Sequence, residues 1–108
     1  MKEIKAYISK HKLGAVIRAL HKVEGLTGLS IIDCHGYGRG LVRAADPESD
    51  FHPGVKLEII CRDEIVQTVV SVIEQAAHTG LKGDGKIYVA PIEVAVRIST
   101  GEQGDGAV

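Results

Sequence analysis

The segment Thr79-Gly80-Leu81-Lys82-Gly83-Asp84-Gly85-Lys86 has the composition of an anion-binding turn. Its glycines let backbone N–H groups approach an anion with no Cβ in the way, and such backbone nests bind phosphate groups. Lys86, which closes the turn, supplies a positive charge for the same anion. The segment is not a Walker A loop, because the GxxxxGK[ST] spacing is missing and a strand is expected to follow. Two interpretations stay open from these residues alone, a phosphate cradle and a plain turn.

Two further segments contain residue types suited to phosphate binding. Gly36-Tyr37-Gly38-Arg39-Gly40 is a second glycine-rich turn with a cation, and Arg97 begins the segment Arg97-Ile98-Ser99-Thr100-Gly101-Glu102. Neither segment is specific by itself. Arg97 alternates with apolar neighbours, so a solvent-facing strand residue is the alternative interpretation for it.

Metal binding is a competing hypothesis. The chain has five histidines and two cysteines, and His35 and His52 flank the long central loop on strands expected to be neighbours. No CxxC or HxxxH spacing occurs, which disfavours a dedicated zinc site. The histidines are His11, His21, His35, His52 and His78.

Hydrophobic periodicity predicts the elements that position these segments. Asp63 is expected as the N-cap of the second helix and Gly80 as the residue that ends it. The expected strands are 2–8, 29–34, 55–61, 86–89 and a short 94–98; the expected helices are 13–23 and 63–79; 36–53 is a long loop and 101–108 a flexible tail.

This order is β-α-β-β-α-β with one extra strand, the ferredoxin-like α+β sandwich. Both helices would cover one face of an antiparallel sheet. The other face is expected to expose apolar side chains such as Tyr7, Ile31 and Ile60, for which a symmetric oligomer is the simplest cover. Strands 29–34 and 55–61 would form a hairpin with Cys34 near Leu57, which argues against a disulfide to Cys61.

The bulk properties exclude several classes of protein. A chain of 108 residues is one domain, 1–108, and a net charge of −1 gives no reason to expect nucleic acid as a partner. No apolar run reaches the ~20 residues that span a bilayer, so no membrane insertion is expected. The charged opening MKEIKAYISKHK lacks the apolar centre of a signal peptide, which predicts a cytoplasmic protein.

Five segments together resemble one family. KEIKAYI, LTGLSIIDCHGYGRG, VKLEIICRDE, HTGLKGDGKIYV and AVRISTGEQG occur in one frame over nearly the whole chain, and they are similar to the PII signal-transduction proteins. The resemblance implies a homotrimer of ferredoxin-like subunits that binds ATP or ADP in the clefts between neighbours. It also implies a regulator of other proteins rather than an enzyme. No general base is evident in the sequence beside Asp84 or Glu58, so hydrolysis of ATP is not expected.

The resemblance also implies a role for each candidate residue, and Glu58 would hold Lys86 in place. The expected phosphate contacts are Gly83, Asp84, Gly85 and Lys86 of the segment 79–86, Arg97 from the adjoining subunit at the start of 97–108, and Gly36, Gly38 and Arg39 for phosphate or ribose; the expected adenine pocket is Thr27, Gly28, Leu29, Ser30 and Ile60.

The segment 36–54 corresponds to the family's T-loop, which docks on a target membrane transporter or metabolic enzyme according to the bound nucleotide. This loop is shorter than usual, and its interior, 40–53, has no tyrosine to be uridylylated. Gly40 and Gly54 stand where residues that help bind Mg²⁺ and 2-oxoglutarate are usual, so both ligands stay open. Ser99 replaces an arginine, so AMP joins ATP and ADP as a candidate ligand. These departures resemble non-standard members, and a metal- or bicarbonate-responsive regulator of a transport system is the alternative.

Overall fold

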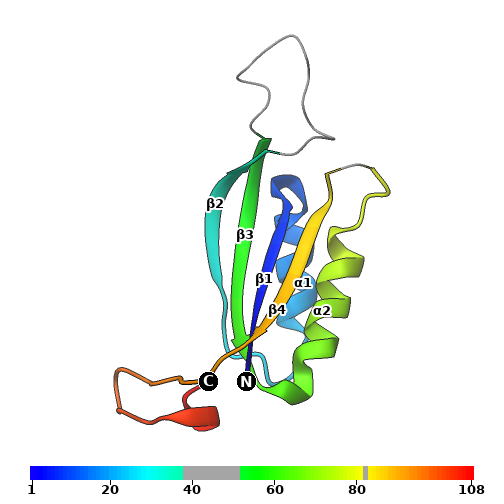
Figure 1. Ribbon diagram of the computed structural model, residues 1–108. Helices are drawn as coiled ribbons and strands as arrows, with labels where there is room; N and C mark the ends of the chain where they lie inside the picture. The colour runs from blue at the N-terminus through cyan, green and yellow to red at the C-terminus, as the bar shows by residue number, and fades with distance from the viewer. Residues whose placement is uncertain (38–51, 82) are drawn as a thin grey trace.

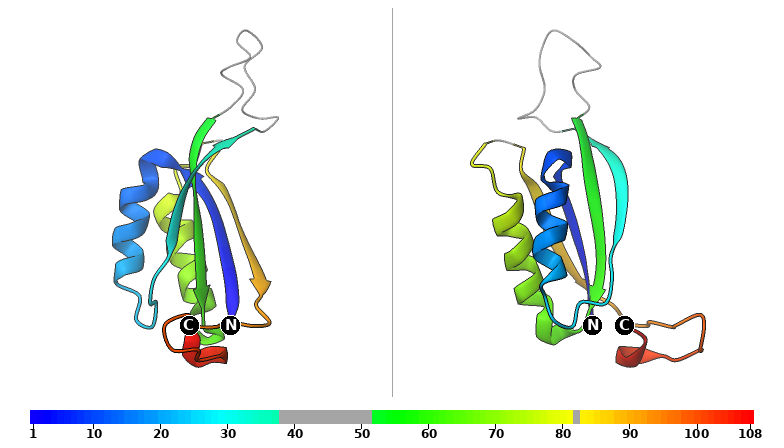
Figure 2. Two further views of the ribbon diagram at one scale, coloured as in Figure 1. Left: turned by 90° about the vertical axis from the view of Figure 1, so that its left-hand side faces the viewer. Right: turned by 180° about the vertical axis from the view of Figure 1, so that it is seen from behind.

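The computed structural model describes residues 1–37, 52–81 and 83–108. Over these residues the chain forms one four-stranded antiparallel sheet with strand order β2-β3-β1-β4. Both α-helices lie on the same face of this sheet (Figures 1 and 2). The arrangement confirms the expected ferredoxin-like α+β fold. Its elements are β1 (Lys2–Ser9), η1 (Lys10–Lys12), α1 (Leu13–His21), β2 (Ser30–Gly36), β3 (His52–Cys61), α2 (Asp63–Ala77), β4 (Gly85–Pro91) and η3 (Gly104–Ala107).

The core lies between the sheet and the two helices. Alternate residues from Ile4 to Ile8 of β1 and from Val55 to Cys61 of β3 point toward the helices, as the period of two along a strand requires, and are at most 5% exposed. Aliphatic stripes of α1 and α2 cover them. The buried side chains are Ile4, Ala6, Ile8, Val55, Leu57, Ile59 and Cys61 from the strands, and Val16, Leu20, Val69, Ile73 and Ala77 from the helices.

The opposite side of the sheet, called here the open face, has no helix over it among the described residues (Figure 2). Its side chains are a mixture of charged, aromatic and aliphatic groups. Tyr7 and Tyr88 make an edge-to-face contact there, with ring centroids 6.1 Å apart. Strand register arranges the central part of this face in two rows, Ile32–Lys56–Tyr7–Lys86 and Ser30–Glu58–Lys5–Tyr88.

The prediction of a final strand at 94–98 is wrong. Over 92–108 the described backbone has a single bridge, Val96 to Gln103, and the sheet ends with β4 at Pro91. Proline has no N–H to continue a ladder. After the end of β4 the chain turns away from the sheet (Figure 1). The segment that was expected to be a flexible tail unless a partner orders it contains regular structure: Gly101 N–H donates to the Arg97 carbonyl at 2.7 Å, and η3 follows.

Three smaller predictions need correction. Cys34 lies opposite Gly54 rather than near Leu57, because β2 continues to Gly36; both cysteines are free thiols. Ile31 is the residue opposite Leu57, so it lies on the helix side and not on the open face. Asp63 is the first residue of α2 rather than its cap, and its carboxylate pairs with the Met1 ammonium at 2.8 Å.

The strands also enter the segments that were expected to be loops. Gly36 pairs with His52, so the ends of the segment 36–54 belong to the β2–β3 ladder. Gly85 likewise belongs to β4, one residue before the expected start of that strand at Lys86. No helix in the described part of the chain is long and apolar enough to cross a membrane.

Candidate functional site

The turn between α2 and β4 is folded around the Asp84 carboxylate. The backbone N–H groups of Thr79 and Gly80 donate to this carboxylate at 2.8 and 3.3 Å, and the Thr79 hydroxyl donates to it as well. His78 Nδ1 lies 3.5 Å from it. The hydrogen bond from the Thr79 side chain, followed by that from its backbone, lowers the pKa of Asp84 below its ordinary value. The side chain of Asp84 therefore stabilises the fold of the turn. The predicted contact with phosphate would accordingly involve the main chain of Asp84 rather than its carboxylate.

Glycine is required on both sides of Asp84. Gly83 and Gly85 have φ angles of +92° and +102°, a region that side chains disfavour. A Cβ on Gly85 would lie 1.6 Å from the Tyr7 carbonyl oxygen, because β4 approaches β1 closely at its first residue. The Ser9 hydroxyl donates to the Gly83 carbonyl at 3.3 Å and ties the other side of the turn to the end of β1. The turn thus has a fixed backbone that no other residue type reproduces at Gly85.

Lys86 differs from the other lysines of the open face. Lys56 Nζ lies 2.6 Å from a Glu58 carboxylate oxygen, and Lys5 Nζ lies 3.0 Å from Glu3. Lys86 is exposed and has no carboxylate within 4.0 Å in the described part of the chain. The open face therefore carries one uncompensated ammonium group among its described lysines, immediately after the glycine turn.

The predicted pair between Glu58 and Lys86 is wrong within one chain. Glu58 lies opposite Lys5, whereas Lys86 lies opposite Tyr7, in the neighbouring row and on the far strand of the sheet. Glu58 bonds to Lys56 instead, two residues before it on the same strand face. That hydrogen bond lowers the pKa of Glu58 and raises the pKa of Lys56.

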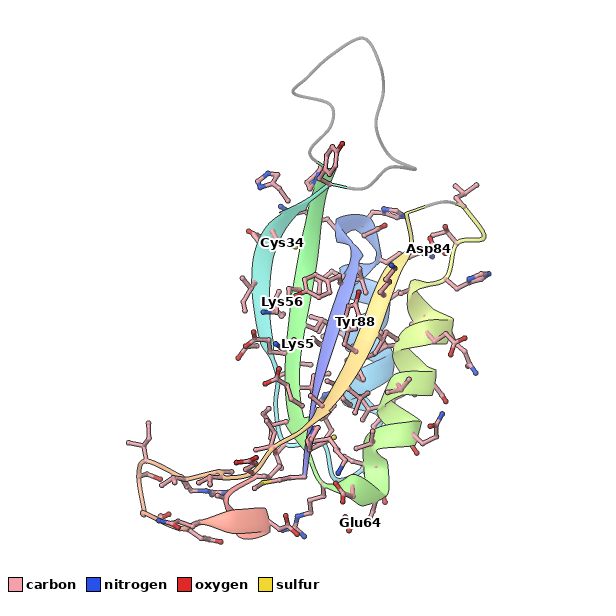
Figure 3. All side chains as sticks on the ribbon, viewed as in Figure 1. Lys5, Cys34, Lys56, Glu64, Asp84 and Tyr88 are labelled. Carbon is pink, nitrogen blue, oxygen red and sulfur yellow. The ribbon has the colours of Figure 1, made fainter. Side chains whose placement is uncertain are left out.

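A cleft of about 530 Å³ lies beside the glycine turn, at what Figure 1 shows as the upper end of the sheet. It brings together three predicted site residues, Gly36, Gly83 and Gly85. Asp84 lies at the same end (Figure 3), and Lys86 is the next residue of β4 after Gly85. Gly38 and Arg39 lie outside the described residues. We call this region the upper half-site.

A second cleft, of about 480 Å³, lies at the other end of the sheet. Its walls include all of the predicted adenine pocket together with Glu58. Sequence reasoning missed the other wall, which the C-terminal segment provides with apolar side chains. The lining residues are Thr27, Gly28, Leu29, Ser30, Glu58 and Ile60, joined by Ile92, Val94, Ala95, Val96, Ala107 and Val108.

Arg97 follows this second wall directly, and its guanidinium donates to the Gly106 carbonyl at 3.4 Å. We call the cleft and Arg97 the lower half-site. Ser30 and Gly36, at the two ends of β2, are six residues apart, which corresponds to about 20 Å along a strand. One chain therefore divides the predicted residues between two half-sites instead of gathering them into one.

Comparison with known proteins shows the family to which this chain belongs. Residues 1–102 match the family model described as nitrogen regulatory protein P-II. The chain belongs to the P-II family. It is 45% identical to the nitrogen regulatory protein P-II of Azospirillum brasilense, 44% to that of Rhodospirillum rubrum and 43% to P-II 1 of Escherichia coli K12. Each of these alignments covers 113 residues and the full length of both proteins.

P-II membership makes this chain a signal-transduction protein of nitrogen regulation, and the family bears the name of a regulator rather than of an enzyme. The names of these relatives give no support to a metal- or bicarbonate-responsive regulator. In the described residues no group of three His, Cys, Asp or Glu side chains lies close enough together to hold a metal ion. The alignments are five positions longer than the 108 residues of this chain.

Proposed function

We propose that this P-II protein is a homotrimer that binds ATP or ADP between neighbouring subunits and controls a target protein through the segment 36–54. The observation that carries the proposal is Lys86, an ammonium group without a carboxylate partner among the described residues, beside the turn shaped by Gly83 and Gly85. Lys5 and Lys56 have carboxylate partners, so Lys86 is the described lysine of this face whose ammonium group is available to an anion. Phosphate groups suit it, because they accept hydrogen bonds from backbone N–H groups and from ammonium together.

The separation of the half-sites supports an intersubunit location. The upper half-site includes the start of the edge strand β4, whereas the lower one lies by β2, β3 and the C-terminal segment (Figure 1). A head-to-tail contact that closes a ring brings two different surfaces of the same protein together at every interface. Such a ring would complete each site with the upper half of one subunit and the lower half of the next.

The open face supports a trimer as well. Tyr7, Ile32 and Tyr88 are 38%, 41% and 52% exposed in the single chain. Aromatic and aliphatic side chains that gather on one uncovered face are typical of a surface buried in an assembly. Three sheets packed around one axis would cover this face.

The lower half-site suits a base better than a phosphate. Most of its walls are aliphatic, and the polar groups of Thr27, Ser30 and Glu58 line the same cleft. A flat heteroaromatic ring binds well in a cleft of this kind, with apolar walls and a few polar groups that fix its orientation. Arg97 beside it would add a cation toward the phosphates.

Control of a target would follow from the position of the segment 36–54. Its ends, Gly36 and His52–Gly54, are strand residues, and Gly36 and Gly54 line the upper cleft. A ligand in that cleft would contact the base of the segment directly, which is the arrangement of ligand-gated loop switches. A membrane transporter or a metabolic enzyme is the proposed class of target.

The test is the binding of ATP, ADP and AMP by isothermal titration calorimetry, with and without Mg²⁺, on protein whose mass is measured by light scattering. We expect a trimer, and at least about tenfold weaker ATP binding by Lys86→Ala, because a hydrogen bond to a charged group contributes about 1.5–3 kcal/mol. Lys22→Ala, at the exposed end of α1 and outside both clefts, is the matched control. Wild-type protein that binds no nucleotide, or an equal loss in both variants, would contradict the proposal.

A further inference from the structure

The upper cleft has a wall that the proposed function does not use. This wall is the junction between β1 and α1, where Ser9, Lys10 and His11 line the cleft together with the glycines of the turn. The hydrogen bond from the Ser9 hydroxyl to the Gly83 carbonyl fixes the junction against that turn. Lys10 therefore lies at the border of the space that the turn encloses.

The charges around this cleft favour an anion. Among the described residues that line it none is a carboxylate, and Lys10 is the lysine. The partner of Lys10 is Asp33, with 3.9 Å between Nζ and Oδ1 and with side chains 61% and 79% exposed. An exposed ion pair of this kind contributes little free energy. The ammonium of Lys10 can exchange it for a phosphate group, which carries a charge of about −1.5 to −2.

Lys10 and Lys86 reach the glycine turn from different sides. Lys86 follows Gly85 on β4 and lies on the open face opposite Tyr7, whereas Lys10 lies across the upper cleft, which Gly85 lines. One phosphate group needs only one of these cations. A longer polyphosphate held at Gly85 would extend into the cleft that Lys10 also lines, where the second cation is available to it.

We propose that Lys10 contacts the terminal phosphate of a bound nucleoside triphosphate and so determines the preference for the triphosphate over shorter nucleotides. This inference rests on the proposed function and adds a residue that selects ligands at the same site. Asp33 competes for the Lys10 ammonium, so removal of the Asp33 charge strengthens triphosphate binding.

The experiment is a calorimetric titration of full-length protein with ATP, ADP, AMP and inorganic tripolyphosphate. The variants are Lys10→Arg, Lys10→Met, Lys10→Glu and Asp33→Asn. Lys12→Met is the matched control, because Lys12 belongs to the same short helix but does not line the cleft. Lys10 is exposed, so all Lys10 variants are expected to fold, which an unchanged melting temperature and mass verify.

We expect Lys10→Met to weaken ATP binding about fivefold, the size expected for loss of one exposed charge contact of about 1 kcal/mol. AMP binding stays unchanged, Lys10→Glu weakens ATP binding further, and Lys10→Arg restores it. In Lys10→Met the ratio of the ADP dissociation constant to the ATP dissociation constant therefore falls. Asp33→Asn raises the affinity for ATP.

Three results would overturn the inference: an unchanged ratio of the ADP and ATP dissociation constants in Lys10→Met, an equal loss for all three nucleotides, or an equal effect of Lys12→Met. Wild-type protein that binds no nucleotide contradicts the proposed function instead. The tripolyphosphate titration then decides the role of Lys10. Tripolyphosphate binding that depends on Lys10 would support an anion site in the upper cleft, and absence of binding would contradict it.

Discussion

The turn of the upper half-site and the C-terminal segment of the lower one are held in different ways. In the turn, Asp84 accepts hydrogen bonds from Thr79 and Gly80, and Gly85 packs against the backbone of β1. The segment 92–108 is connected internally by backbone hydrogen bonds and one bridge, and Ile98 within it is 98% exposed. The turn of the upper half-site is held by contacts within one chain, whereas the lower half-site presents apolar surface that a neighbour in the proposed trimer would cover. Substitutions should therefore act on folding at the upper end and on assembly at the lower end.

The largest effect is expected at Gly85. Alanine there places its Cβ against the Tyr7 carbonyl oxygen and keeps an unfavourable positive φ, so β4 must move away from β1. We expect Gly85→Ala to lower the free energy of unfolding by at least about 3 kcal/mol, as other changes that force backbone displacement do. Thermal or urea unfolding measures this directly.

Gly80→Ala is the matched control for that experiment. Gly80 also has a positive φ, +82°, but a Cβ there meets nothing within 4 Å. Its cost is the left-handed conformation alone, about 1–2 kcal/mol. Equal destabilisation by the two alanines would show that the close approach of β4 to β1 is not what holds the turn.

A smaller effect, with a distinct dependence on pH, is expected at Asp84. Its folded-state pKa lies below the ordinary value because Thr79 donates hydrogen bonds to the charged form. The carboxylate therefore adds stability that is fully present above the ordinary carboxyl pKa, about 3.9, and is lost as the pH falls through the lower folded-state value. We expect Asp84→Asn to lower the melting temperature at pH 7 and to flatten its fall below pH 4.

Asp105→Asn is the control for the acid dependence, because Asp105 is an exposed carboxylate 3.9 Å from the Met1 ammonium. It should change the melting temperature little at either pH. If Asp84→Asn melts like the wild type at pH 7, the hydrogen bonds of Thr79 and Gly80 do not fold the turn. Weaker ATP binding together with the lower melting temperature would connect the turn to the proposed phosphate contact.

The sequence was sufficient for the sheet, because burial on one side only imposes a period of two on β1 and β3. The same period was misleading at Val94, Val96 and Ile98, where alternate apolar residues line a cleft or stay exposed without forming a strand. Periodicity reports which side of the chain is apolar but not what covers it. Pro91 was the local signal that the ladder would end there.

Pairs across the sheet were harder to predict than pairs along one strand. Lys56 and Glu58 are two residues apart and so share a strand face, a relation visible in the sequence. The expected pair of Glu58 with Lys86 depended on strand order and register, which local sequence does not determine. The C-terminal wall of the lower half-site was missed for the same reason, because η3 and its neighbours reach that cleft through tertiary packing.

The smallest effect on stability, and the sharpest contrast between the two ends, is expected at Ile98. Its side chain is almost fully exposed, so Ile98→Ala should change the unfolding free energy by less than about 0.5 kcal/mol at a protein concentration at which the proposed trimer is assembled. On dilution, the variant should dissociate at a higher concentration than the wild type, measured by mass photometry, because the neighbour would lose an apolar contact. Lys22→Ala, which shortens an exposed side chain at the end of α1 and outside both half-sites, is the control and should leave dissociation unchanged. Equal dissociation of both variants and the wild type would mean that the neighbour does not cover the C-terminal segment, and the lower half-site would then have to bind its ligand without help.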